Sequence, residues 1–446
     1  MRDSSLHPIR PLNLDDAFSG RELLVVGCTG FLGKVMLAML LERLPTVRKI
    51  HVVLRVPGGV APEHRLWRGV LDSGAFASLR ASLGRDFEPV LRDKLVALAG
   101  DVARPLIGLS PAEVAGMRGR LSAIVNVAGI VDFDPPLDLA LEVNAHGVRH
   151  LVELSHQLGG VPLLHTSTCF VAGDRQGFVE ERDPRLEPFA RGALAGVGGD
   201  WSPEEELRSC QRLIEAERVR LDEGHHRDDI ERDAREALVG EGTLFSPRAL
   251  EAARARARRK LARRLLVAAG MRRARALGFP NTYTYTKALG EQLIARSGVP
   301  FAIVRPAIVE SCERYPSRGW NEGSNTSAPL IYLLREGALQ IPGSDHALDV
   351  IPCDHVAAGT LLALAELLDG TAAPVYQLGT SDSNRCSMRR FFELSGLYKR
   401  RYYRAGGGRG PSWLRGLQAH WEGVMVQRRT YEHWGPPALA LWSRRL

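Results

Sequence analysis

Short apolar runs alternate with longer stretches of mixed apolar and polar residues along most of the chain. The runs have the length and composition of buried strands, and they lie at residues 21–26, 49–54, 94–99, 123–125, 161–165 and 374–379. The stretches between the earlier runs have the composition of helices and are long enough for right-handed crossovers between parallel strands. This pattern predicts an α/β fold built on a doubly wound parallel sheet.

The first predicted strand leads directly into a glycine-rich turn. Gly27, Gly30 and Gly33 follow residues 21–26, and an apolar helix is predicted over residues 35–43. Glycines at these positions allow a tight turn, a close approach of the backbone to a phosphate, and close packing of the helix on the strand. The helix N-terminus would direct unpaired N–H groups at a pyrophosphate. This context predicts a Rossmann-type dinucleotide site, and a purely structural turn is the alternative.

The ends of the following strands carry further candidate contacts to a dinucleotide. Arg55 follows the strand 49–54, where an enzyme that uses NAD usually has an acid for the ribose hydroxyls. An arginine there suits the 2′-phosphate of NADP, and an ordinary surface cation is the alternative. Asp101, after the strand 94–99, is a candidate for the adenine, and residues 127–129 are a candidate flat wall beside the cofactor. Position alone supports these two assignments, and plain loops are the alternative.

A tyrosine and a lysine near the start of a later helix are candidate catalytic groups. Tyr283 and Lys287 stand four residues apart, so their side chains share one helix face. A neighbouring ammonium favours the phenolate and is predicted to lower the tyrosine pKa from its usual value of about 10. The motif is short, and a solvated pair on a helix face is the alternative.

Hydroxyl side chains follow the strand 161–165. Ser167 and Thr168 would lie at the carboxyl edge of the sheet, where ligands of α/β proteins bind. A hydroxyl that donates to a substrate carbonyl, a tyrosine that donates a proton and a lysine that holds a ribose form a coherent set for hydride transfer. Either hydroxyl fits this role, and a simple turn cap is the alternative.

The ordered series of these motifs resembles an extended short-chain dehydrogenase/reductase, and specifically the fatty acyl-CoA reductases of the alcohol-forming, male-sterility type. The resemblance runs from about residue 20 to about residue 400. It rests on residues 27–34, 101, 131–134, 144–147, 166–170, 281–291, 304–311, 319–323 and 349–354. So long an ordered series is far more specific than any one motif.

The resemblance implies roles for particular residues. Thr168, rather than Ser167, would bind the carbonyl, Tyr283 would be the general acid, and Lys287 would bind the nicotinamide ribose and tune Tyr283. Pro306 to Val309 would lie beside the nicotinamide. The implied cofactor-binding set is Gly27, Thr29, Gly30, Phe31, Leu32, Gly33, Arg55, Asp101, Val102, Val127, Ala128, Gly129, Asn144, Tyr283, Lys287, Pro306, Ile308 and Val309.

The implied reaction is the NADPH-dependent reduction of a long-chain fatty acyl-CoA. Hydride attack on the thioester gives a hemithioacetal, loss of the thiol gives an aldehyde, and a second hydride gives the primary fatty alcohol. One alternative is a thioester reductase that releases an aldehyde or alcohol from a carrier-protein-bound acyl chain. Another is a non-catalytic NADP-binding regulator, against which the complete set of Thr168, Tyr283 and Lys287 argues.

The predicted domains follow from these assignments. A long insertion of helical composition separates the threonine from the tyrosine, and its arginine-rich part suggests either a solvated cap over the acyl pocket or a basic surface. Such a surface suits an acidic carrier protein, the phosphates of coenzyme A or an anionic membrane. The division is an NADP-binding Rossmann domain at 1–180 and 281–310, the insertion at 181–280, an acyl-binding region at 311–385, and a reduced C-terminal region at 386–446.

Composition limits the remaining possibilities. The chain has 446 residues, a formal charge of +8 and six cysteines without a closely spaced pair, so neither a metal site nor a disulfide framework is indicated. The positive charge favours anionic ligands such as NADPH and coenzyme A, and we do not interpret it as nucleic-acid binding. The sequence shows no signal-peptide pattern and no apolar run that would span a bilayer. We therefore expect a cytoplasmic protein, with peripheral membrane contact through its basic helices as an option.

Overall fold

The computed structural model describes residues 12–175, 177–187, 189, 201–242, 246–323, 331–332, 340–343, 345–408, 410–420 and 423–434. Contacts divide the chain into two compact units. The first unit comprises the described parts of Met1–Arg305 together with Ala357–Gln377, and the second those of Pro306–Val356 and Leu378–Leu446. Each unit is described by itself.

A parallel sheet forms the centre of the first unit, as the apolar runs predict. In the described residues it has seven strands in the order β11-β6-β5-β4-β1-β2-β3. The strands are β1 Glu22–Val26, β2 Lys49–Leu54, β3 Leu95–Ala99, β4 Leu121–Asn126, β5 Leu163–Thr166, β6 Phe301–Pro306 and β11 Val375–Leu378. Val25 of β1 pairs with Val52 on one side and with Val125 on the other, so the first strand is central. The order reverses at β1, which places a ligand crevice at the carboxyl ends of β1 and β4.

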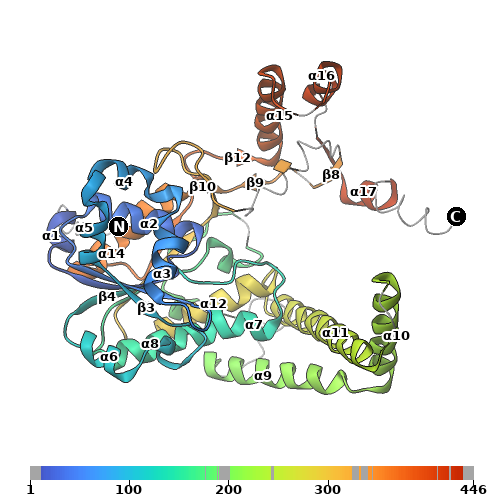
Figure 1. Cartoon of the computed structure of the whole chain (residues 1–446), viewed down its shortest axis with the longest axis horizontal. Coiled ribbons are helices and arrows are strands. Elements are labelled where there is room, and N and C mark those ends of the chain that lie inside the picture. The colour runs from blue at the N-terminus through green and yellow to red at the C-terminus, as the bar shows by residue number, and fades with distance from the viewer. Residues whose placement is uncertain are drawn as a thin grey trace, which may run out of the picture. The chain divides into compact units, whose positions relative to one another are not determined.

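Helices connect the strands and cover the sheet (Figure 1). The long connections are α2 between β1 and β2, α8 between β4 and β5, and α12 between β5 and β6. The helices before the insertion are α1 Leu14–Phe18, α2 Phe31–Arg43, α3 Pro62–Leu66, α4 Ala77–Leu83, α5 Phe87–Lys94, α6 Pro111–Met117, α7 Leu137–Leu141 and α8 Gly147–Gln157, and α12 spans Thr282–Ala295. The alternation of strand and helix confirms the predicted Rossmann-type fold.

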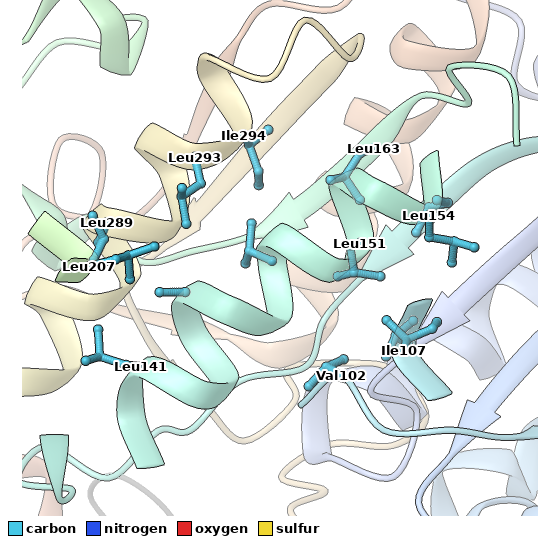
Figure 2. Close-up of a cluster of buried hydrophobic side chains, with 14 of the residues drawn as sticks. Val102, Ile107, Leu141, Leu151, Leu154, Leu163, Leu207, Leu289, Leu293 and Ile294 are labelled. Carbon is cyan, nitrogen blue, oxygen red and sulfur yellow. The ribbon is translucent and has the colours of Figure 1, made fainter. Parts of the chain in front are cut away.

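The inserted segment is helical, as predicted, and it is partly built into the core of the first unit. Its helices are α9 Pro203–Arg220, α10 Gly224–Gly240 and α11 Pro247–Ala276. Figure 2 shows Leu207 of α9 beside Leu289 of α12, in the same buried cluster as Leu151 and Leu163. The helix α9 is therefore part of the fold and not a loose cover. A separate apolar cluster joins α10 to α11 through Ala234, Leu238, Ala253 and Ala257.

The second unit contains short strands and several helices. Its strands are β7 Ile308–Glu310, β8 Gln340–Pro342, β9 Ala347–Leu348, β10 Val350–Pro352, β12 Cys386–Ser387 and β13 Val424–Val426. Its helices are α15 Met388–Arg404, α16 Ser412–His420 and α17 Arg428–Trp434, and α14 Cys353–Asp369 starts in this unit. Strands β7 and β10 pair in parallel, as do β8 and β13, whereas β9 and β12 are antiparallel. No helix in the described part of the chain has both the length and the apolar character of a bilayer-crossing segment.

Candidate active site

The turn after β1 brings backbone segments so close together that only glycine fits. Gly27 has φ +100°, and a Cβ added there would lie 2.5 Å from the Ala128 nitrogen. A Cβ on Gly33 would lie 2.3 Å from the Gly27 carbonyl oxygen. Gly30 is the N-cap of α2, and the first turn of a helix directs its backbone N–H groups outward, where an anion can bind. This cradle fits the pyrophosphate of a dinucleotide.

The other predicted loop contacts gather at the same edge of the sheet. Arg55 is exposed directly after β2. Asp101 follows β3, where its Oδ1 accepts the Ala103 N–H at 3.1 Å, and Val102 is buried beside it. Residues 127–129 follow β4, and the Val127 N–H donates to the Val26 carbonyl at 2.9 Å. Because β4, β1, β2 and β3 are neighbours, these segments share one carboxyl edge.

Helix α12 starts where the motif requires it. The Asn281 side chain caps the helix and accepts the Thr284 N–H at 2.9 Å. Tyr283 and Lys287 are therefore one helical turn apart, and both are buried. The hydroxyls of Tyr283 and Thr168 are hydrogen-bonded, and Thr168 Oγ1 also accepts the Phe170 N–H at 3.3 Å. The structure thus brings the three predicted catalytic side chains together from α12 and from the segment directly after β5.

The predicted direction of the Tyr283 pKa shift is wrong in this structure. Burial raises the pKa of Tyr283 to about 12, and the hydrogen bond from Thr168 only partly opposes this. The ammonium of Lys287 donates to the Thr166 carbonyl at 2.9 Å, and burial lowers the pKa of Lys287 to about 8. Desolvation therefore outweighs the Thr168 hydrogen bond in setting the Tyr283 pKa, and Tyr283 keeps its proton as an acid must.

Asn144 lies within the same group of residues. It belongs to a π-helical turn, Glu142–His146, and its Oδ1 accepts the Ile130 N–H at 3.1 Å. Its Nδ2 donates to Thr286 Oγ1 at 3.2 Å, which ties the turn to α12. A Cβ on Gly129 would lie 2.6 Å from Lys287 Nζ and 3.3 Å from Asn144 Oδ1. Gly129, Asn144 and Lys287 therefore meet at one point.

The structure adds an aromatic neighbour that the sequence did not identify. The ring of Phe133 stands edge-on to the ring of Tyr283, with 6.1 Å between centroids. Phe133 is 56 % exposed, so it presents an apolar face next to the acid. Its only sequence signal was its place in the segment 131–134, which supported the family resemblance without a role.

A buried polar network ties the insertion to α12. The Tyr285 hydroxyl donates to Glu206 Oε1 of α9, and Arg273 of α11 donates to both Glu206 oxygens at 2.8 and 2.6 Å. Tyr285 is fully buried and stands two residues from Tyr283. The network therefore fixes the first turn of α12 against two inserted helices. No sequence pattern indicated it, because the partners are far apart in the chain.

The last predicted cofactor contacts lie in the second unit. Pro306 ends β6, and Ile308 and Val309 lie on β7. Within that unit the Ala307 N–H donates to the Leu378 carbonyl at 2.8 Å and the Ile308 N–H to the Asp349 carbonyl at 3.0 Å. Their role beside the nicotinamide stays a prediction.

Comparison with known proteins identifies relatives over most of the chain. The family described as "Male sterility protein" matches residues 25–360. "Fatty acyl-CoA reductase 8" of Arabidopsis thaliana is 30 % identical over 375 residues, which cover 82 % of this chain and 67 % of that protein. "Fatty acyl-CoA reductase 2, chloroplastic" from the same plant is 28 % identical over 84 % of this chain, and the match spans only 56 % of its length. The "Alcohol-forming fatty acyl-CoA reductase" of Simmondsia chinensis is 27 % identical over 85 % of this chain and 70 % of its own.

Solved structures share the fold. The terminal R domain from the myxalamid PKS-NRPS biosynthetic pathway matches with a TM-score of 0.53 and 17 % identity, covering 93 % of this chain and 85 % of that one. The reductase domain of a nonribosomal peptide synthetase from Mycobacterium tuberculosis matches with a TM-score of 0.51 and 16 % identity, covering 97 % of this chain and 78 % of that one.

Proposed function

This chain belongs to the male sterility protein family, and from that premise we propose that it reduces a long-chain fatty acyl-CoA with NADPH, through the aldehyde, to a primary fatty alcohol. The observation that carries the proposal is the hydrogen bond between Thr168 and Tyr283, one helical turn from buried Lys287. Thr168 and Tyr283 supply two hydroxyl donors for a carbonyl oxygen, and Lys287 supplies a nearby cation.

The residues present fit a nicotinamide dinucleotide. The glycine cradle and the first turn of α2 would hold the pyrophosphate, and Lys287 with Asn144 would hold the nicotinamide ribose. When bound, the cofactor supplies the hydride for each reduction. We propose NADPH over NADH because of Arg55. Its guanidinium is exposed directly after β2, where it can bind the 2′-phosphate that NADPH has and NADH lacks.

The chain's own residues would carry the proton and the developing charge. Thr168 and Tyr283 donate to the thioester oxygen and stabilise the negative charge that forms on it. Tyr283 gives its proton to that oxygen as the carbonyl carbon is reduced, and the Lys287 ammonium stabilises the phenolate that remains. The hemithioacetal then breaks its C–S bond, so that coenzyme A leaves as the thiol and an aldehyde remains. The Tyr283 phenolate then takes up a proton from solvent, so that Thr168 and Tyr283 can donate to the aldehyde oxygen when the second hydride arrives.

The proposal includes the predicted function of each segment of the chain. Residues 1–180 and 281–310 would bind NADPH, 181–280 would form the insertion, 311–385 would bind the acyl chain, and 386–446 would be a reduced C-terminal region. Cytoplasmic placement and peripheral membrane contact through basic helices also stay predictions.

The proposal is tested by the choice of thioester. Purified protein is incubated with NADPH and either a long-chain acyl-CoA or the same acyl chain on a carrier protein, and nicotinamide oxidation is followed by absorbance. We expect turnover of the acyl-CoA. Turnover of the carrier-bound chain alone would establish the carrier-dependent reductase instead. Tight NADPH binding without turnover of either thioester would favour a regulator.

A further inference from the structure

The inserted helix α11 carries more cations than its neighbours neutralise. Most of its basic side chains form ion pairs that fix the helix to the rest of the first unit. The pairs are Arg254 with Glu231, Arg256 with Glu241, Arg258 with Asp222, Arg263 with Asp132, Arg272 with Glu217 and Arg273 with Glu206. These cations have a structural role and are not free to bind a ligand.

Three other cations in the middle of α11 remain without such a partner. Arg259, Lys260 and Arg264 are exposed, and no carboxylate within the described ranges pairs with them. Arg259 and Lys260 are neighbours in sequence, and Lys260 and Arg264 are one helical turn apart, so the three cations flank Arg263 on one side of the helix. The like charges of Lys260 and Arg264 repel one another at this spacing. We call these three residues the α11 basic face. Its unbalanced charge marks it as a surface that an anion would stabilise.

Short contacts connect Arg263, which these three cations flank, to the catalytic tyrosine. Arg263 lies 3.7 Å from the Asp132 carboxylate, and the next residue, Phe133, has its ring 6.1 Å from that of Tyr283. The C-terminal end of α11 lies next to α12, and the helix extends outward from there toward α10 (Figure 1). Arg263, which adjoins the α11 basic face, is therefore linked to Tyr283 through Asp132 and Phe133.

From this arrangement we propose that Arg259, Lys260 and Arg264 bind the phosphates of coenzyme A in the thioester substrate, an inference that rests on the proposed function. A coenzyme A thioester has its reacting carbonyl at one end of the pantetheine arm and its phosphates at the other. With the carbonyl at buried Thr168 and Tyr283, the phosphates must lie outside, where only exposed groups reach them. Guanidinium forks and an ammonium are the side chains that bind phosphate oxygens best.

The test compares substrates that differ only in their phosphates. The triple variant Arg259→Gln, Lys260→Gln, Arg264→Gln is assayed with acyl-CoA, acyl-dephospho-CoA and acyl-pantetheine. Three exposed charge contacts together predict a KM for acyl-CoA raised by about tenfold, an effect that weakens at high salt. For acyl-pantetheine, which lacks the phosphates of the nucleotide, kcat/KM should stay at the wild-type value. Arg248→Gln changes an exposed arginine in the first turn of the same helix; as the control for loss of a surface cation, it should leave kcat/KM for all three substrates unchanged.

Two results would overturn the proposal. An unchanged KM for acyl-CoA would show that the phosphates bind elsewhere. This holds also if the triple variant impairs only the reduction of carrier-protein substrates. An equal loss with acyl-pantetheine would show that the cations act on the fold and not on a ligand. Calorimetric binding of free coenzyme A separates this idea from the proposed function. Weaker binding to the triple variant would support the α11 site even if no thioester were reduced.

Discussion

Lys287 donates a 2.9 Å hydrogen bond from its ammonium to the backbone carbonyl of Thr166, joining α12 to the end of β5. Lys287 is buried on α12, one turn after Tyr283. Its acceptor Thr166 ends β5, two residues before Thr168. One interaction therefore sets the relative positions of all three candidate catalytic side chains. It also explains how a buried lysine remains hydrogen-bonded in a region that lowers its pKa.

The free energy of unfolding should depend on pH because Lys287 is buried. Burial lowers the Lys287 pKa from its ordinary value of 10.5 to about 8. Between these two pH values the unfolded chain holds a proton at this residue that the folded chain has released, so the free energy of unfolding rises with pH in this window. We expect wild type to gain stability relative to Lys287→Met from pH 8 to pH 10 in urea unfolding. A constant difference across that range would contradict the lowered pKa.

Tyr283→Phe should remove the acid and little else. The variant keeps the ring that packs against Phe133 and loses only the hydroxyl, so turnover should fall by roughly a hundred- to ten-thousand-fold. Fluorescence titration should show NADPH binding close to that of wild type. The exposed Tyr398→Phe serves as the matched control, and near-normal turnover of Tyr283→Phe would remove Tyr283 from this role.

Thr168 and Ser167 can be separated directly. Thr168→Val removes a donor that meets Tyr283, so kcat should fall by about a hundredfold or more, whereas Thr168→Ser should restore most of it. Ser167→Ala is the neighbouring control, and its buried hydroxyl has no hydrogen-bond partner in the described structure. If Ser167→Ala lost as much activity as Thr168→Val, the assignment of the carbonyl donor to Thr168 would be wrong.

The cofactor preference should depend on Arg55. Arg55→Asp replaces a cation with an anion at the expected position of the 2′-phosphate, so Kd for NADPH should rise by about tenfold or more while that for NADH changes little. Titration of both nucleotides measures the ratio. An unchanged ratio would show that another residue selects the cofactor.

The inserted helices should contribute to the stability of the first unit through their buried polar network. Glu206→Gln leaves Arg273 without its carboxylate and weakens the partner of buried Tyr285, at a cost of about 3 kcal/mol in the free energy of unfolding. Glu204→Gln, an exposed change on the same helix, should cost less than about 0.5 kcal/mol. Equal effects of the two changes would mean that the buried network does not stabilise the fold.

The strands were predictable because both faces of a parallel sheet are buried, so each strand is a nearly continuous apolar run. The run 49–54 coincides with β2, and the run 161–165 differs from β5 only at its ends. The glycine turn was predictable for a similar reason, since Gly27 and Gly33 leave no space for a Cβ. In both cases the constraint acts on neighbouring residues and is visible locally.

The features that sequence could not supply depend on contacts between distant residues. The Tyr283 pKa follows burial, which only the packed structure defines, so a local argument from Lys287 predicted the wrong direction. Glu206 and Tyr285 are 79 residues apart, and no local period links them. Phe133 had no role assigned from sequence, because only the fold places its ring beside Tyr283.

We propose that a single site in this protein reduces first a thioester and then an aldehyde. The most direct test measures the ratio of NADPH oxidised to coenzyme A released in a reaction with a limiting long-chain acyl-CoA, with the lipid product identified by mass spectrometry. If one site carries out both reductions, two NADPH will be oxidised for each thiol released, and the product will be a primary alcohol. A ratio of one with aldehyde as the final product would contradict the second reduction, and the absence of thiol release would contradict the reaction itself.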